Sequence, residues 1–340
     1  MAPAGSKSDC VHSLIALIGL AVVAGALAVF VEARGAAPSE ALRAAVSAPK
    51  APAAVVALST TRPAASGPRR YARYFSRRVA QPRPMPPTPQ IIHSPPAAER
   101  LLDHFVTIGY TLERVRGAAG AVPRVYLDRL PSDLPQIDSS DARKRIFVKA
   151  MLPLLLAENE RILADRERVV RLARRLDAGR ALQPHERAWL RQTADEYDVA
   201  AGDFDELARR VDAVPPSLAL AQAALESGWG TSRAAQRGHA TFGQMNFRVA
   251  GEQTISEVKA FAALPQAVAA YARNLNTHRA YAEFRARRAA MRAAGDAPDG
   301  AELALHLLRY SERKVEYVRA VRALIRANRL GAFDAARLAG

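Results

Sequence analysis

Hydrophobic and polar positions follow a helical period over most of the chain from Leu101 onward. Over 139–176, apolar residues recur every three or four positions and charged turns follow them. Ser139 and Ser140 are of a residue type that caps the start of a helix. The pattern therefore predicts a long helix over 139–176, kinked at Pro153 because proline removes a backbone donor.

Further helices are predicted after Pro184, over 203–211 and after the proline pair 215–216. The last of these helices has residues at i, i+3, i+4 and i+7 that share one face: Leu218, Ala221, Gln222 and Leu225. It ends at Glu226. An imperfect alternation of apolar and polar residues over 251–261 predicts a short β-hairpin instead.

The N-terminal part of the chain has a different pattern. Residues 11–31 contain no Asp, Glu, Lys or Arg, and the run is long enough to cross a bilayer core of about 30 Å. We interpret 1–35 as a transmembrane anchor, with a cleaved signal segment as the alternative. The positive charges that follow the span would keep the body of the protein cytoplasmic by the positive-inside rule.

The segment 36–100 is predicted to be a disordered linker rich in Pro, Ala and Arg. It holds 12 of the 22 prolines and a charge of +8, which is ten Lys or Arg minus Glu40 and Glu99. This is half of the net charge of +16. The cluster at 69–78 interleaves tyrosine and phenylalanine with arginine, a pattern that suits base stacking or an anionic membrane surface. A solvated linker explains the cluster better, so a nucleic-acid partner is not predicted.

Composition adds few constraints. A chain of 340 residues with 49% hydrophobic residues can form two domains, or one domain with long appendages. The single cysteine, Cys10, excludes an internal disulfide and a thiolate cluster for a metal. The histidines lack the spacing of a metal site and no Gly-rich phosphate loop is present, so neither a metal nor a cofactor is predicted.

Glu226 is the candidate for chemistry. It ends an alanine-rich apolar helix, where the helix dipole and an apolar surround both raise the pKa of a carboxyl group. A carboxyl group that stays protonated near neutral pH suits a general acid. Gly228 can end the helix, and Trp229 offers a flat plate for a sugar ring. The plainer alternative is a surface glutamate with Trp229 as a core anchor.

The segment 214–247, "VPPSLALAQAALESGWGTSRAAQRGHATFGQMNF", resembles the catalytic segment of the Bax-type glucosaminidases, bacterial cell-wall hydrolases of glycoside hydrolase family 73. "VPRVYLDRLPSDLP" before it and "YARNLNTHRAYAEFR" after it are similar to further parts of the family, over about 100–330. The resemblance implies a mainly α, lysozyme-like helical domain with a small β-hairpin lobe, after the transmembrane helix and the linker. The expected divisions are a helical lead-in at 101–213, the glucosaminidase domain at 214–330 and a tail at 331–340.

The resemblance implies that Glu226 is the proton donor for cleavage of the β-1,4 bond after N-acetylglucosamine in peptidoglycan. Two carboxylates usually share such work, and the hairpin offers Glu257 as the first choice and Glu252 as the second. The N-acetyl oxygen of the substrate is the alternative to a second carboxylate. Candidate substrate-binding residues are Trp229, Phe242, Tyr271, Asn274 and Tyr310. Core packing explains Tyr271, and capping explains Asn274, almost as well.

One local difference from the family affects the roles that the resemblance implies. His239, Ala240 and Thr241 stand where relatives have Asn-Asn-Leu. His239 is expected to be an exposed loop residue, with hydrogen bonding to sugar as the alternative. The substrate implied by the resemblance outweighs the charge rule. We therefore expect a single-pass protein of the bacterial inner membrane with its catalytic domain in the periplasm.

Several alternatives stay open. A muramidase or a lytic transglycosylase on the same fold would also act on peptidoglycan glycan strands. A catalytically weak peptidoglycan-binding protein would keep the groove without the reaction. A cytoplasmic, membrane-tethered nucleic-acid binder would use the arginine cluster of 69–78. The sequence makes no prediction of the oligomeric state.

Overall fold

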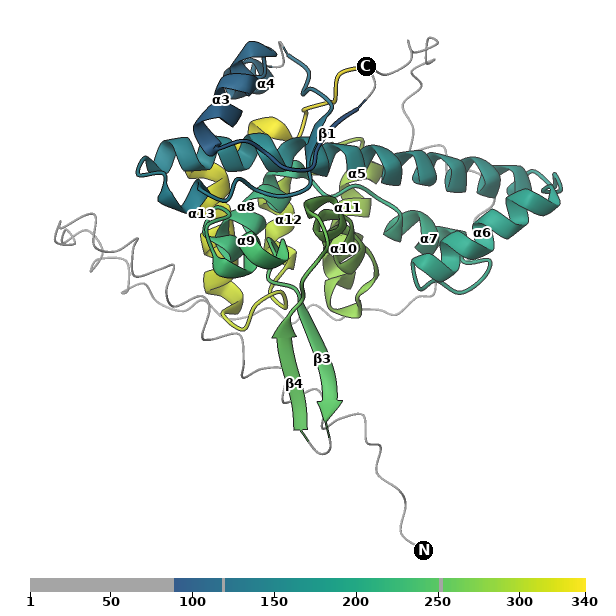
Figure 1. The fold of residues 1–340 in the computed structure, drawn as a ribbon. Helices are drawn as coiled ribbons and strands as arrows, with labels where there is room; N and C mark the ends of the chain where they lie inside the picture. Colours follow the sequence, from purple (N-terminus) through teal and green to yellow (C-terminus); the bar gives the residue numbers. More distant parts are fainter. Residues whose placement is uncertain (1–88, 118–119, 251–252) are drawn as a thin grey trace, which may run out of the picture.

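The computed structural model describes residues 89–117, 120–250 and 253–340, which form a mainly helical protein (Figure 1). The mainly α fold class is confirmed. The predicted span at 11–31 and most of the predicted linker lie outside the described residues. Within the described ranges, no helix combines the length and apolar character that crossing a membrane requires.

The first described elements begin inside the segment predicted to be linker. Strand β1 (Gln90–Ile92) pairs in parallel with β2 (Val125–Leu127). Helix α3 (Ala98–Thr107) follows and buries an apolar face that includes Leu101 and Phe105. Helix α4 (Leu112–Arg116) completes this layer. Regular structure is thus present before residue 100, because the amphipathic face of α3 has a partner in the core.

Helix α5 (Ser140–Asp177) crosses the whole molecule (Figure 1). Its cap is as predicted, since Ser139 Oγ accepts a hydrogen bond from the backbone N–H of Ala142 at 3.2 Å. The helix assignment runs through Pro153, because 146–156 is buried between the other helices and tertiary packing compensates for the missing donor.

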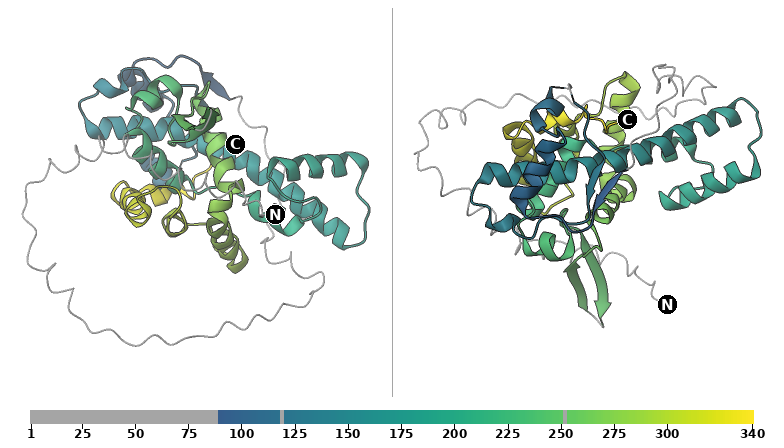
Figure 2. Two further views of the ribbon diagram at one scale, coloured as in Figure 1. Left: turned by 90° about the horizontal axis from the view of Figure 1, so that it is seen from below. Right: turned by 45° about the horizontal axis from the view of Figure 1, so that its top comes forward.

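The C-terminal half of α5 and the next two helices form an arm, residues 160–211, that projects from the rest of the molecule (Figure 2). Helix α6 (Pro184–Glu196) begins at the predicted proline. Helix α7 (Phe204–Arg210) begins after Asp203, whose side chain accepts a hydrogen bond from the N–H of Glu206 at 2.9 Å. Both predicted helices are therefore confirmed.

Asp212 joins the arm to the rest of the domain. Its side chain is 2% exposed and binds Arg292 through two hydrogen bonds of 2.6 Å. Arg166 and Arg288 lie 3.7 and 3.6 Å from its carboxylate. Burial opposes ionisation of Asp212, but the three arginines outweigh it and hold the pKa of Asp212 below its usual value. This buried cluster connects α5 to helix α11 (Ala282–Ala294).

Helix α8 (Pro216–Ser227) lies at the centre of the second half of the fold. It packs against α5, α13 (Lys314–Ala327), α12 (Gly300–Leu303) and the 3-10 turn η7 (Leu330–Phe333). This position explains why the alanine-rich run before Glu226 is apolar on every face.

The residues predicted to be a tail hold the start of α8. Asp334 accepts hydrogen bonds from the backbone N–H and the hydroxyl of Ser217, both at 2.7 Å, and from the N–H of Gly300 at 3.2 Å. Burial raises the pKa of Asp334 to about 6. Leu338 forms a parallel bridge to Val122. Residues 331–340 are therefore packed against the domain.

The hairpin is present but starts earlier than predicted. Strands β3 (Met245–Ala250) and β4 (Gln253–Val258) pair antiparallel and project away from the helices (Figure 1). The prediction of 251–261 missed the whole first strand, although apolar and polar residues alternate over 245–249 in "MNFRVA".

The remaining elements complete the helical body. They are α9 (Arg233–Gly238), α10 (Leu264–Thr277) and the 3-10 turns η4 (Leu134–Gln136), η5 (Arg279–Tyr281) and η6 (Ala304–His306).

Candidate active site

Glu226 lies in the last turn of α8, as predicted. The helix ends at Gly228 in the left-handed conformation, and Trp229 and Gly230 also have positive φ angles of 59° and 82°. A Cβ atom on Gly230 would lie 2.5 Å from Leu130 Cδ1 and 2.9 Å from Phe147 Cδ2. This turn is therefore fixed against the body of the protein, and it holds the end of α8 in place.

The carboxyl group of Glu226 faces the loop 239–243. A Cβ atom on Gly243 would lie 2.6 Å from Glu226 Oε2, and Gly243 has a φ of +63°. Only glycine accommodates both the close approach and this backbone conformation without strain. The loop thus covers part of the carboxyl group, and the Glu226 side chain remains only partly exposed.

Burial raises the pKa of Glu226 from 4.5 to about 7. A hydrogen bond from Tyr317 and the positive charge of Arg313 act in the opposite direction and do not cancel the effect. A large fraction of Glu226 is therefore protonated at neutral pH. The prediction of a raised pKa agrees with this environment, although burial is its largest cause.

A chain of hydrogen bonds leads from the core to Glu226. The hydroxyl of Tyr271 donates to Gln222 Oε1 at 2.8 Å, and Gln222 Nε2 donates to the hydroxyl of Tyr317 at 3.0 Å. Because the Tyr317 oxygen accepts from Gln222, its own proton is available for Glu226. Tyr271, Gln222 and Tyr317 are all buried, so the chain fixes where the last hydroxyl points.

Aromatic rings form a wall beside the carboxyl group. The rings of Tyr310 and Tyr317 are stacked with centroids 5.4 Å apart, and Tyr281 lies 5.9 Å from Tyr310. The hydroxyl of Tyr310 donates to the backbone carbonyl of Phe242 at 3.0 Å. Phe242 in turn stacks on Tyr271, with centroids 4.0 Å apart. The wall therefore connects α13 and α10 to the loop over Glu226.

The predicted substrate-binding residues differ in how exposed they are. Phe242 and Tyr271 are 1% and 0% exposed, so they support the site from within the core. Tyr310 is partly exposed beside Glu226, and the charge of Glu226 is among the causes that raise its pKa. Asn274 is also partly exposed and forms a hydrogen bond with Tyr281.

Trp229 lies in another pocket. Its ring packs edge to face on Phe147, with centroids 5.8 Å apart, and Lys144 Nζ lies 5.7 Å from the ring centroid. The ring is only partly buried. Trp229 shares this pocket with residues of α4, α5 and the end of α13.

The second carboxylate stays a prediction. Glu257 is exposed on β4, one residue before its end and opposite Asn246. Glu252 lies outside the described residues. Within the part of the chain that the structure describes, Arg313 is the single charge that perturbs the pKa of Glu226.

His239 is buried, so the expectation of an exposed loop histidine is wrong. It is 8% exposed, has a φ of 52°, and its Nδ1 atom has no hydrogen-bond partner among the described residues. Burial and the nearby Arg129 lower its pKa. The left-handed backbone at the end of α9 turns this side chain inward, which the residue order did not indicate.

Sequence reasoning missed four residues of this site: Gln222, Tyr281, Arg313 and Tyr317. Gln222 gave a signal, because it precedes Glu226 by one helical turn on an otherwise apolar helix. Tyr317 and Arg313 lie about ninety residues further along and reach Glu226 only through the packing of α13 on α8.

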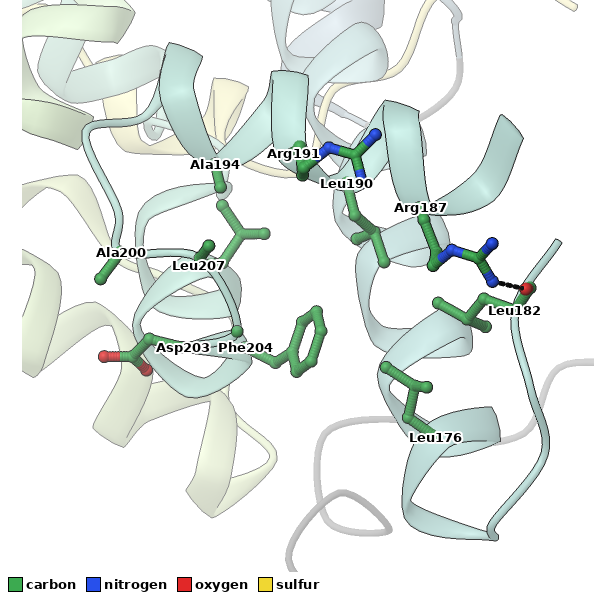
Figure 3. Close-up of a pocket in the computed structure, with 12 residues that line it drawn as sticks. Leu176, Leu182, Arg187, Leu190, Arg191, Ala194, Ala200, Asp203, Phe204 and Leu207 are labelled. Carbon is green, nitrogen blue, oxygen red and sulfur yellow. Dashed lines mark hydrogen bonds between the residues drawn. The ribbon is translucent and has the colours of Figure 1, made fainter. Parts of the chain in front are cut away.

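A further pocket of about 210 Å³ lies between the end of α5 and the helices α6 and α7 (Figure 3). Leucines and Phe204 line it, and Arg187 at its edge donates to the carbonyl of Leu182. Asp203, the one carboxylate among its described lining residues, caps α7. The carboxylate of this pocket therefore already has a structural role.

Comparison with known proteins gives two matches. A family model described as glucosaminidase, mannosyl-glycoprotein endo-beta-N-acetylglucosaminidase, matches residues 201–330. Protein bax of Escherichia coli (strain K12) is 31% identical over 194 residues, which cover 54% of this chain and 69% of that protein. No solved structure matches the chain. The matched residues 201–330 contain Glu226, the loop over it and the aromatic wall.

Proposed function

Because the chain belongs to the family of Bax-type glucosaminidases, we propose that it is a peptidoglycan hydrolase that cleaves the β-1,4 bond after N-acetylglucosamine. Membership of this family implies glycoside hydrolase chemistry on a peptidoglycan-related substrate. The single observation that carries the proposal is the carboxyl group of Glu226, whose pKa is about 7 at the end of a buried helix. Such a group can give a proton to a glycosidic oxygen at neutral pH.

The surroundings of Glu226 suit a proton donor. When Glu226 loses its proton it becomes anionic, and the Tyr317 hydrogen bond and the Arg313 charge both favour that form. Their stabilisation therefore grows as the proton moves to the leaving oxygen, which is what lowers an activation barrier. Tyr310 and Asn274, both partly exposed, are the residues best placed to hold the reacting sugar. The buried Phe242 and Tyr271 hold this wall in position.

The group that attacks the sugar carbon is the open part of the mechanism. Glu257 remains our first candidate, because the hairpin that carries it starts from the loop that covers Glu226. Glu252 is the second candidate on the same hairpin. Assistance by the N-acetyl oxygen of the substrate would need neither carboxylate.

One observation favours a second candidate function. Among the described residues, no carboxylate perturbs the pKa of Glu226, whose only charged neighbour in this sense is Arg313. A lytic transglycosylase works with a single acid and releases an anhydro-muramyl end instead of a hydrolysed one. The same active site therefore supports this reaction as the alternative.

Digestion of purified glycan strands decides between these functions. The wild-type protein is expected to release products with a reducing N-acetylglucosamine, and Glu226→Gln is expected to release almost none. Mass spectrometry of the ends separates the outcomes, since a muramidase leaves reducing muramic acid and a transglycosylase leaves the anhydro form. Equal digestion by the two proteins would refute the role of Glu226.

We also propose that the catalytic domain lies in the periplasm, tethered to the inner membrane by residues 11–31. The substrate supports this placement, because peptidoglycan lies outside the cytoplasmic membrane. A reporter enzyme that is active only in the periplasm, fused after residue 340, is expected to be active. A cytoplasmic signal would count against the placement.

A further inference from the structure

The pocket that contains Trp229 is lined by positive charge. It has a volume of about 290 Å³, and four cationic side chains line it: Arg116, Lys144, Arg145 and Arg329. Asp141 is the one carboxylate among its described lining residues, and its side chain is 86% exposed. The pocket also lies at the first two turns of α5, where the helix dipole favours an anion.

Lys144 lies 3.8 Å from Asp141 Oδ1, whereas Arg116 is not fully satisfied by the described residues. The Arg116 guanidinium donates to the carbonyl of Asn328 at 3.1 Å and lies over the ring of Phe333, but its buried Nε–H has no partner among the described residues. Burial and the neighbouring Arg329 both lower the pKa of Arg116, and Glu113 acts in the opposite direction. Burial, the largest cause, thus disfavours the charged form of Arg116, and an anion in this pocket would favour it.

The backbone is strained at two residues of the same pocket. Trp229 and Arg329 have φ angles of 59° and 52°, in the left-handed region that disfavours residues other than glycine. Both conformations carry their side chains to the pocket lining, so the strain coincides with the place where the cations gather.

The other half of the lining is apolar, with Leu112, Val148, Leu330 and the Trp229 ring. A phosphate would leave this half without a match, whereas a carboxylate on a short aliphatic residue fits both halves. The anion expected here is therefore the carboxylate of a peptide.

The pocket is within reach of the acid. Tyr317 contacts Glu226 near the start of α13, and Ala327 lines the pocket at the end of that helix, ten residues later. This separation is about 15 Å along the helix axis. A peptide of three to five residues spans about 10–18 Å when extended. The length of such a peptide therefore matches this separation along α13.

We propose that this pocket is a binding site for a carboxylate of the peptide stems of the wall polymer. The identity of the ligand rests on the proposed function, while the anion site itself rests on Arg116, Arg329 and their neighbours. In this role the pocket selects strands that carry peptides over strands from which the peptides have been removed.

Trp229 provides a direct readout, because the chain has only two tryptophans and Trp189 lies in the arm. In the full-length Trp189→Phe protein, the free stem peptide is expected to produce a saturable change in fluorescence at 150 mM salt. The fully amidated peptide is expected to bind at least about 10-fold more weakly, since it lacks the charge. Inorganic phosphate is the third probe and is expected to give no saturation at the same concentrations.

The variant pair Arg116→Gln and Arg329→Gln, in the same background, is expected to lose the peptide response by at least about 10-fold. The matched control, Arg180→Gln with Arg191→Gln, removes the same charge from the arm and should keep it. If the first pair fails to fold, Arg145→Gln with Arg329→Gln makes the same test on two exposed residues.

Three results would overturn the inference: equal binding of the amidated peptide, saturation by phosphate at equal concentration, or an unchanged response in the pocket variants. The free peptide has no glycosidic bond, so this result does not depend on cleavage. Peptide binding without glycan cleavage would count against the proposed function alone. Cleavage without peptide binding would count against the pocket alone.

Discussion

Asp212 and Glu226 are both carboxyl groups withdrawn from water in the same domain, yet their surroundings have opposite effects. Three arginines lower the pKa of Asp212, whereas burial with one hydrogen bond and one distant charge leaves the pKa of Glu226 at about 7. Asp212 connects the arm to the body. Glu226 can bind or release a proton near neutral pH. The partners of a buried carboxyl group, more than its burial, separate a structural role from a catalytic one.

The largest expected effect comes from replacing Glu226, the carboxyl group with the raised pKa. Glu226→Gln removes the acidic proton and is expected to lower glycan cleavage by about 10²–10⁴-fold. The measurement is the initial rate of reducing-end release, with far-UV circular dichroism as the control for folding.

The same Glu226→Gln variant should be more stable than the parent at pH 8. The folded-state pKa of Glu226 is raised from 4.5 to about 7, so the ionised form costs stability. The cost is absent below pH 4.5, grows as the pH rises to 7, and is at most about 3 kcal/mol above pH 7. Urea unfolding at pH 8 and pH 4 measures it. Equal stabilisation at both values would contradict the assignment.

The second effect is a loss of stability on replacing Asp212, the carboxyl group with the lowered pKa. Asp212→Asn leaves three arginines around a neutral group and is expected to lower the free energy of unfolding by about 3–5 kcal/mol at pH 7. Because the folded-state pKa of Asp212 is lowered, its contribution is present above its unfolded pKa and is lost as the pH falls below it. Urea denaturation measures the loss. Asp177→Asn, at an exposed position at the end of α5, is the control and should change little.

A third effect tests the close approach to Glu226. Gly243→Ala places a methyl group against Glu226 Oε2 and forces a left-handed backbone on alanine. The expected cost is about 1–3 kcal/mol in the free energy of unfolding, with a loss of turnover because the carboxyl group must shift. Gly295→Ala is the matched control, since Gly295 also has a positive φ but has open space around it. Equal losses of activity in the two variants would argue that the Gly243 effect is backbone strain alone.

The smallest expected effect is a shift in the pKa of Glu226 when one of its partners is removed. Tyr317→Phe deletes the hydrogen bond that lowers the pKa of Glu226, so that pKa should rise. A hydrogen bond of about 1 kcal/mol corresponds to about 0.7 pH units. The high-pH limb of the rate profile should move up by this amount, because the acid stays protonated longer. A downward shift would mean that Tyr317 does not donate to Glu226.

Local features of the sequence predicted much of the fold. The cap at Ser139, the prolines that start α6 and α8, and Gly228 after Glu226 each act on neighbouring residues, so they can be recognised without knowing the fold. The hairpin prediction missed the first strand, although apolar and polar residues alternate over 245–249.

The site was harder to predict than the fold. Glu226 and its raised pKa follow from its place at the end of an apolar helix. Tyr317 and Arg313 do not, because their contact with Glu226 depends on how α13 packs on α8. The buried state of His239 depends on its left-handed backbone conformation, which no residue pattern indicates. Long-range packing and unusual backbone angles are therefore what the sequence leaves undetermined.

The contact between Asp334 and Ser217 joins residues 117 positions apart. A ribosome that has just made the acid-bearing helix must continue for more than a hundred codons before the carboxylate that closes the first turn of that helix exists. Until then, the backbone N–H of Ser217 at the start of α8 lacks this hydrogen-bond acceptor. The first turn of α8 therefore lacks its contact with Asp334 until nearly all of the domain has been synthesised.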